Sequence, residues 1–224
     1  MQKALTLADS TVGKKALLAV SGLVLFGFVL GHMVGNLQVF LGPEVFNGYA
    51  ATLKGNLPLL WGTRIVLSVS VVTHIVMAVQ LMGRSSKARP VGYRKKDNAV
   101  TSYAAITMKL SGPLLFFYIA FHIAHFTAPG LALGNYEHST TDVYANFVSA
   151  FTIPWVTALY VIAQLLLGLH LYHGAWSLFQ TLGLSHPRYD GKKRLVAQVF
   201  ALLIMAGNVA MPIAVLVGVI PPAG

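Results

Sequence analysis

Five long apolar segments dominate this sequence and leave it few possible folds. A helix rises about 1.5 Å per residue, so about 20 apolar residues are needed to cross the roughly 30 Å hydrocarbon core of a bilayer. Within the five segments, Arg64 is the one residue that carries a full charge. We therefore expect an all-α integral membrane protein with five transmembrane helices. The expected spans are residues 16–41, 62–82, 110–128, 153–178 and 195–219, in a single transmembrane domain of residues 1–224.

The composition agrees with a lipid-embedded chain and excludes several kinds of site. Charged residues make up 10% of the 224 residues, against roughly 25% in soluble domains. Cysteine is absent, which excludes disulfides, thiolate metal sites, iron–sulfur ligation and covalent haem attachment. The net charge of +10 comes from basic residues in short loops, which indicates membrane orientation rather than nucleic-acid binding. The first 15 residues do not resemble a cleaved signal peptide.

The basic residues predict how the helices are oriented. Of the 16 Lys and Arg residues, 14 precede the first span or lie between the second and third or the fourth and fifth spans. Lys54 and Arg64 lie on the other side. The positive-inside rule then places the N-terminus in the cytoplasm and the C-terminus outside. Trp61, Trp155 and Trp176 fall at expected helix ends, where an amphipathic ring prefers the membrane interface.

Six of the eight histidines lie inside the expected spans, where an imidazole needs a polar partner. A lone histidine in such a place often only hydrogen-bonds a neighbouring helix. Histidines on four separate helices instead indicate a shared site. They are His32 and His74 in the first and second spans, His122 and His125 in the third, and His170 and His173 in the fourth.

Depth in the membrane sorts four of these histidines into two pairs. Measured from the middle of each span, His32 lies about 6 Å and His122 about 5 Å toward the outside. By the same measure, His74 lies a few ångströms and His170 about 7 Å toward the cytoplasm. Two bis-histidine haems b stacked along the membrane normal require such an outer and an inner pair, with one neutral imidazole on each side of each iron. Four helices would then form the haem-binding bundle, and the fifth would be peripheral.

Two spans carry a second histidine three residues after the first, and both members cannot bind the same side of one iron. Depth favours His122 over His125, which lies about 4.5 Å further out. Depth also favours His170 over His173, which lies nearer the cytoplasmic end. We expect His125 and His173 to bond a haem propionate, a backbone carbonyl or quinone.

Small residues near these histidines have two interpretations. Gly27, Gly31 and Gly35 repeat at four-residue spacing, which suits either a flat macrocycle or close helix packing. Gly168 and Gly174 in the fourth span are equally ambiguous.

Acidic residues are absent from all five spans. Hard cations prefer oxygen ligands, and proton relays in membranes usually use carboxylates, so a cation transporter or a proton pump is disfavoured. A histidine-lined carrier of zinc or nickel stays open. Haem propionates would need cations, and the candidates at suitable levels are Lys54, Arg64 and Lys109.

Four stretches of the chain resemble, in order, the first four helices of a known family. They are SGLVLFGFVLGHMVGNLQVFLGPEVFNGYAATL, VVTHIVMAVQL, KLSGPLLFFYIAFH and LLLGLHLYHGAWSLFQ. The family is the dihaem cytochrome b membrane subunit of bacterial succinate:quinone oxidoreductases, which comprise succinate dehydrogenase and fumarate reductase. The resemblance covers most of the chain and implies five spans in the bacterial cytoplasmic membrane.

The resemblance implies that two haems b are bound by His32, His74, His122 and His170. It also implies two partners on the cytoplasmic side. These are a flavoprotein with FAD, which interconverts succinate and fumarate in the tricarboxylic acid cycle, and a subunit with Fe–S clusters. The chain has no dicarboxylate site and would anchor the complex and exchange electrons with quinone. Some members have a Glu two residues before the haem ligand of the fourth helix. Gly168 stands at that place, which argues against a proton path through such a carboxylate.

Two surfaces are candidates for partners. The loop from Arg84 to Lys109 could dock the iron–sulfur subunit, although its charge is also explained by topology alone. Quinone is expected near the outer haem, because quinone chemistry exchanges protons and needs polar groups in contact with water. Polar residues at that end are Asn36, Gln38, Glu44, Asn47 and Lys54. Among them, Glu44 is the candidate residue of the quinone site.

Two other functions remain open. The chain could be the cytochrome b anchor of another membrane dehydrogenase, of hydrogenase or formate dehydrogenase type. It could also be a histidine-lined metal transporter without haem. A low-spin b-type spectrum would exclude the transporter, and a covalently flavinylated partner would favour the succinate enzyme.

Overall fold

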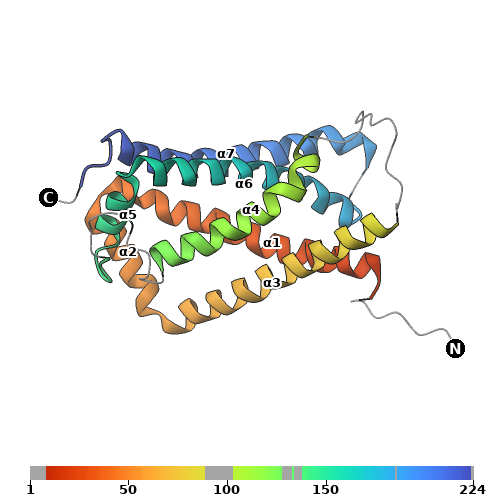
Figure 1. Ribbon diagram of the computed structural model, residues 1–224, viewed down its shortest axis with the longest axis horizontal. Helices are drawn as coiled ribbons and strands as arrows, with labels where there is room; N and C mark the ends of the chain where they lie inside the picture. The colour runs from red at the N-terminus through yellow and green to blue at the C-terminus, as the bar shows by residue number, and fades with distance from the viewer. Residues whose placement is uncertain (1–8, 89–102, 128–132, 134–137, 185, 223–224) are drawn as a thin grey trace.

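The structure is a computed structural model that describes residues 9–88, 103–127, 133, 138–184 and 186–222, and over these ranges its regular elements are all helical. Five helices are long and apolar enough to cross a membrane, so the prediction of an all-α protein with five spans is confirmed. They run side by side, with the start of α1 and the end of α7 at opposite ends of the bundle (Figure 1). The five are α1 (Thr11–Asn36), α3 (Leu57–Lys87), α4 (Tyr103–Phe126), α6 (Pro154–Thr181) and α7 (Asp190–Leu216).

Several helices extend past the expected spans, because hydropathy detects only their apolar parts. α1 begins before residue 16 because the hydroxyl of Ser10 accepts the Gly13 N–H at 2.9 Å and caps the helix. α3 continues beyond residue 82 and is tied there to the start of α1. Arg84 donates to the Thr11 hydroxyl at 3.0 Å. Polar residues thus continue the helices outside the apolar segments.

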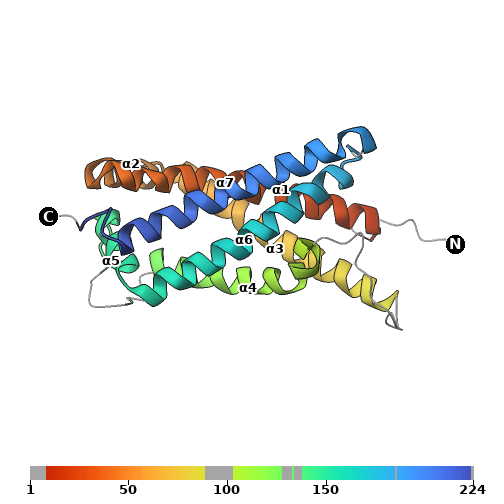
Figure 2. The ribbon, with the colours of Figure 1, turned by 90° about the horizontal axis from the view of Figure 1, so that it is seen from above.

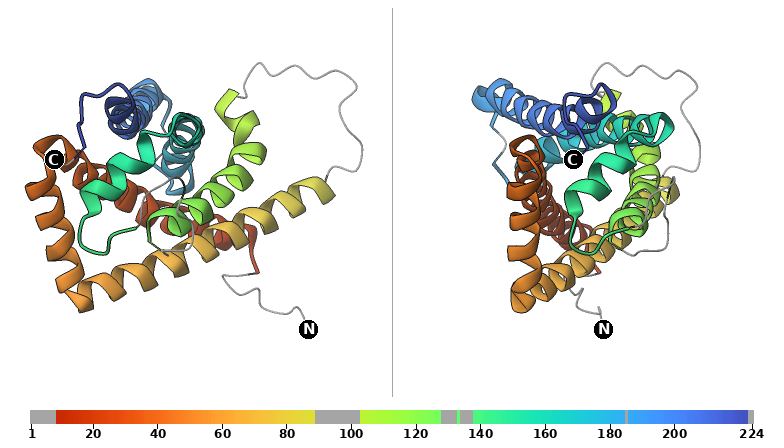
Figure 3. Two further views of the ribbon diagram at one scale, coloured as in Figure 1. Left: turned by 60° about the vertical axis from the view of Figure 1, so that its left-hand side comes forward. Right: turned by 90° about the vertical axis from the view of Figure 1, so that its left-hand side faces the viewer.

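Two short helices were not predicted. α2 (Pro43–Gly55) follows the 3-10 helix η1 (Leu37–Leu41), and α5 (Val143–Phe151) precedes α6. With 13 and 9 residues, neither is long enough to cross a bilayer. Both lie at the same end of the bundle, here called the capped end, which Figure 3 (right) views directly. A further 3-10 turn, η2 (Pro187–Tyr189), precedes α7.

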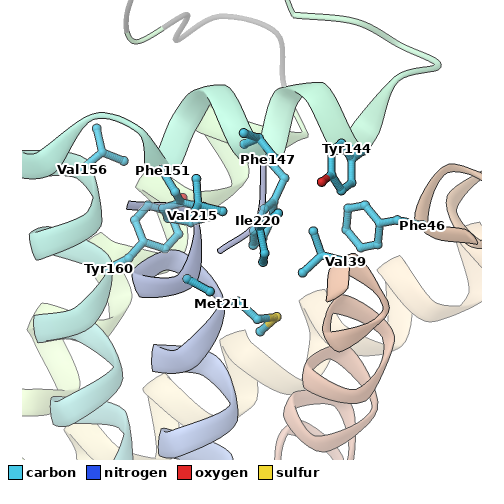
Figure 4. Close-up of a cluster of buried hydrophobic side chains, with 12 residues drawn as sticks. Val39, Phe46, Tyr144, Phe147, Phe151, Val156, Tyr160, Met211, Val215 and Ile220 are labelled. Carbon is cyan, nitrogen blue, oxygen red and sulfur yellow. The ribbon is translucent and has the colours of Figure 1, made fainter. Parts of the chain in front are cut away.

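The capped end contains the larger cluster of buried apolar side chains. Val39 of η1 and Phe46 of α2 meet Phe147 of α5, and Met211 of α7 lies beneath them (Figure 4). The rings of Phe46 and Phe147 are 5.8 Å apart between centroids and meet edge to face. This packing holds α2 and α5 across the ends of the long helices.

Asp142 caps α5 and joins it to α2. Its Oδ1 accepts the Ala145 N–H at 2.9 Å and Nδ2 of Asn47 at 3.0 Å, and these bonds lower the pKa of the carboxyl group. The stabilisation is therefore present above the usual carboxyl pKa and is lost as the pH falls through the lowered value. We expect Asp142→Ala to cost about 1 kcal/mol of unfolding free energy at neutral pH, and the difference from wild type to shrink in acid. Thermal unfolding in detergent at both pH values measures this, and an equal cost at both would contradict the role of the carboxylate.

The long helices pack as neighbours in a definite order. α1 packs along α3, α4 along α6, and α7 along α6, with a smaller contact between α7 and α1 (Figure 2). Small residues permit the approach of α7. A Cβ added at Gly168 would lie 3.0 Å from Sδ of Met205, and one at Gly207 would collide with the Met33 side chain. Of the two interpretations of Gly168, helix packing therefore applies.

Candidate functional site

Each facing pair of histidines comes from two helices that make little direct contact with each other. Over the described residues, no close packing joins α1 to α4 or α3 to α6. His32 of α1 nevertheless faces His122 of α4, and His74 of α3 faces His170 of α6. His32 is exposed and the other three are half-buried, so each ring keeps open surface beside it.

The separation of the facing rings suits one metal ion between them. The centroids of His32 and His122 are 5.8 Å apart, with ring planes at 85°, and those of His74 and His170 are 6.2 Å apart at 53°. An imidazole nitrogen binds a transition metal at about 2 Å, and the ring centroid lies about 1 Å further away, so two imidazoles on opposite sides of one ion stand about 6 Å apart. The spacing of the residues present therefore fits bis-histidine ligation. Their role as haem ligands stays a prediction.

The two pairs lie at different levels along the bundle. The His74 ring lies against Ser21 and Gly22 of α1, ten or eleven residues before His32. The helical rise converts this to about 15 Å. On α4, Ser111 lies beside His170 and eleven residues before His122, which gives about 16 Å. The pairs are thus stacked along the helix axes, with the His32–His122 pair nearer the capped end.

A serine hydroxyl lies beside one nitrogen of His74 and leaves the other open to a metal. Ser21 Oγ donates to the carbonyl of Leu17 at 2.8 Å, and it is also 3.3 Å from Nδ1 of His74. A hydroxyl has one proton, so when Ser21 donates it to the Leu17 carbonyl, Ser21 accepts from the ring and Nδ1 carries the ring proton. Nε2 then presents its lone pair, as metal-binding histidines require. Fully buried Ser111 lies 3.5 Å from Nδ1 of His170 and is placed for the same role.

These serines were not among the predicted site residues, although the sequence carried a signal for them. Ser21 precedes His32 by eleven residues, and Ser111 precedes His122 by eleven. Eleven residues are close to three turns of 3.6, so each serine shares a helix face with its histidine. A polar residue on that face needs a hydrogen-bond partner in the bundle interior. In the structure this partner is the histidine of a neighbouring helix, His74 for Ser21 and His170 for Ser111.

His125 and His173 differ from the four facing histidines. His125 is 1% exposed and its Nδ1 lies 3.0 Å from the hydroxyl of Tyr160, while Nδ1 of His122 lies 3.3 Å from the same hydroxyl. Tyr160 was not predicted from the sequence either. Among the described residues, no hydrogen-bond partner is recorded for Nε2 of His125 or for Nδ1 of His173.

The three glycines that repeat at four-residue spacing in α1 divide into two groups. A Cβ added at Gly27 or Gly31 would have no atom within 4 Å, so space is open beside that part of the helix. At Gly35 the same atom would collide with the Tyr49 side chain of α2. Gly35 therefore serves helix packing, whereas Gly27 and Gly31 remain available to a macrocycle.

Several predicted polar residues have other partners at the capped end. Lys54 donates to the Thr140 carbonyl at 2.7 Å, and Asn47 binds Asp142. The Arg64 guanidinium lies over the Trp61 ring, 5.0 Å from its centroid. Asn36 donates to the carbonyl of His32 at 2.9 Å. Glu44, in the first turn of α2, and Lys109, near the start of α4, are exposed.

Comparison of the chain with protein-family models, curated proteins and solved structures finds no match. The function is therefore inferred from the residues of the site and from the sequence resemblance. Within the described ranges, no three or more His, Asp or Glu side chains gather into a group that could hold a metal ion. The candidate metal ligands are therefore two pairs of imidazoles, His32 with His122 and His74 with His170.

Proposed function

We propose that this chain is a dihaem cytochrome b, the membrane-anchor and electron-transfer subunit of a bacterial succinate:quinone oxidoreductase. The observation that carries the proposal is the facing of His32 with His122 and of His74 with His170, with ring centroids 5.8 and 6.2 Å apart. The four residues come from four helices, and the two pairs are stacked along the bundle. Electron transfer across a membrane requires redox sites at successive levels, and the two pairs provide two such levels.

The protein supplies position and proton placement at these sites. A bound haem supplies one-electron chemistry, and its axial ligands set the potential. With Ser21 as an acceptor, Nδ1 of His74 keeps the ring proton, which leaves Nε2 as the neutral donor. Over the described residues, α1 does not pack closely on α4, nor α3 on α6. Space therefore remains in the bundle interior beside the histidine rings.

The histidine-lined metal transporter is less well supported. Zinc sites in proteins use three or four ligands, whereas each pair here offers two imidazoles. The two pairs are also about 15 Å apart by helix rise and cannot share one ion. The cytochrome b anchor of another dehydrogenase keeps the same haem sites and is distinguished by its partner subunits.

The pigment of the purified full-length protein tests the proposal. We expect a reduced-minus-oxidised spectrum of low-spin b type and two haems per chain by the pyridine haemochrome method. A colourless protein from haem-replete cells would exclude the proposal. A covalently flavinylated subunit and an iron–sulfur subunit are expected to co-purify with it. The docking loop proposed for the latter falls largely in residues 89–102, outside the described residues.

We also place quinone at the capped end, beside the His32–His122 pair. Glu44 is exposed there and lies in the first turn of α2, where water can exchange protons. If Glu44 contributes to the site, Glu44→Gln should lower quinone reductase activity about tenfold or more while the haem spectrum stays unchanged. Unchanged activity and inhibitor binding would remove Glu44 from the site. A quinone bound only at the opposite end would overturn the location itself.

A further inference from the structure

A buried lysine lies in α1, at the end of the bundle opposite the capped end, where the start of α1 lies beside the end of α3 (Figure 1). Lys14 is 7% exposed, and its ammonium group donates to Oε1 of Gln80 on α3. Within the described residues, Lys14 forms no ion pair with a carboxylate. An ammonium group has three N–H donors, and one neutral amide neither satisfies all three nor balances the charge. The site around Lys14 therefore calls for an anion.

Membrane orientation does not explain why Lys14 is buried. Basic residues that orient a membrane protein extend their charged ends toward the aqueous interface, and exposed Lys15 fits that description. Burial of a charge is costly unless another group balances it, and a buried charge in a membrane helix usually has a function.

The face of α1 that carries Lys14 also carries residues of both histidine sites. Lys14 precedes Ser21 by seven residues and His32 by eighteen. These separations are close to two turns and equal to five turns of 3.6 residues, so the three residues share one side of the helix. Ser21 lies 3.3 Å from Nδ1 of His74, which shows that this side faces the bundle interior. Lys14 is thus directed toward the histidine sites.

Two helices place the ammonium group at the same distance from the His74–His170 pair. On α1, Lys14 precedes Ser21, which lies beside His74, by about 10 Å of helix rise. On α3, Gln80 follows His74 by six residues, or about 9 Å. The propionates of a haem lie at the rim of the macrocycle, two methylene groups beyond the ring. A carboxylate of a haem centred on this pair can therefore reach Lys14.

The other cations predicted for propionates do not serve this pair. Lys54 and Arg64 lie toward the capped end and have partners there, and Lys109 is exposed. We infer, on the basis of the proposed function, that Lys14 binds a propionate of the haem at the His74–His170 pair. Gln80 orients the ammonium group by accepting one of its protons.

A cation in this place should raise the midpoint potential of one haem. Reduction adds an electron, and a nearby positive charge stabilises the ferrous form more than the ferric form. At about 10 Å and an effective dielectric constant of about 20, one unit charge changes the equilibrium by about tenfold. His32 lies about 27 Å from Lys14 along α1, so the haem at the His32–His122 pair should not respond.

The test measures the midpoint potential of each haem in the purified full-length protein. Lys14→Met keeps the length of the side chain without its charge. It should shift the ferric–ferrous equilibrium of the haem at the His74–His170 pair about tenfold toward ferric, which is about 59 mV for one electron. Lys14→Arg should keep most of the wild-type potential. The His122→Ala protein, expected to keep only that haem, identifies its signal.

Lys15→Met is the matched control. It removes the same charge from the next residue of the same helix, but from an exposed position. Both midpoint potentials should stay as in the wild type.

The outcomes separate this inference from the proposed function. A wild-type protein without haem would overturn the proposed function first. With two haems present, an unchanged potential in Lys14→Met, equal shifts of both haems, or an equal shift in Lys15→Met would overturn the inference alone. Loss of the co-purifying iron–sulfur subunit from Lys14→Met without a shift in potential would also overturn it, and would assign Lys14 to that interface. If Lys14→Met does not assemble, Lys14→Gln, which keeps a polar end beside Gln80, is judged by the same results.

Discussion

Replacing His122 with alanine is expected to leave one haem b per chain in place of two, whereas replacing His125 with alanine leaves both. The ring of His122 faces His32 at 5.8 Å, where one iron fits between them. His125 instead directs Nδ1 at Tyr160 and is enclosed by aromatic rings. Removing one imidazole from a bis-histidine site should release that haem or turn it high-spin. Haem per protein and the spin state by optical spectroscopy give the answer.

The same comparison applies at the other pair. We expect His170→Ala to remove the second haem, because His170 faces His74 at 6.2 Å. The matched variant His173→Ala should keep both haems low-spin and at most shift a potential. If His125→Ala or His173→Ala lost a haem while replacement of its neighbour kept both low-spin, the ligand assignment for that pair would be wrong.

Gly22→Val is expected to remove or weaken the haem at the His74–His170 pair, although Gly22 is not a ligand. A Cβ at Gly22 would lie 3.2 Å from Cε1 of His74, and the two methyl groups of valine extend further. Because α1 packs along α3, the ring has to move. We expect a loss of haem affinity about as large as the removal of an outer-shell partner causes, 10- to 100-fold.

Gly62→Val is the matched control for this substitution. Gly62 lies in α3, is exposed, and would present its Cβ to open space. Titration of haem into haem-depleted protein measures both variants. Equal affinity for the second haem in Gly22→Val and Gly62→Val would show that the approach of Gly22 to His74 does not matter for binding.

The number of spans was predictable from the sequence because hydrocarbon imposes a strong constraint. A segment without charges and of sufficient length has few alternatives to a helix that crosses the bilayer. The helix starts and ends were less predictable, since capping by Ser10 and the bond from Arg84 to Thr11 lie outside the apolar windows. α2 and α5 escaped prediction because they are short and owe their stability to the cluster at the capped end.

The sequence by itself determined that four histidine-bearing helices share a membrane and that His32 and His122 lie at one level and His74 and His170 at another. Depth follows from a fixed rise per residue, so a linear chain suffices to compute it. Only the tertiary structure decided which side chains hydrogen-bond the imidazoles. Tyr160 and His122 are 38 residues apart, and their contact depends on how α6 lies against α4. Ser21 reaches His74 because α1 packs along α3. Rotation and pairing of helices arise from packing between faces, which no property of a single helix specifies.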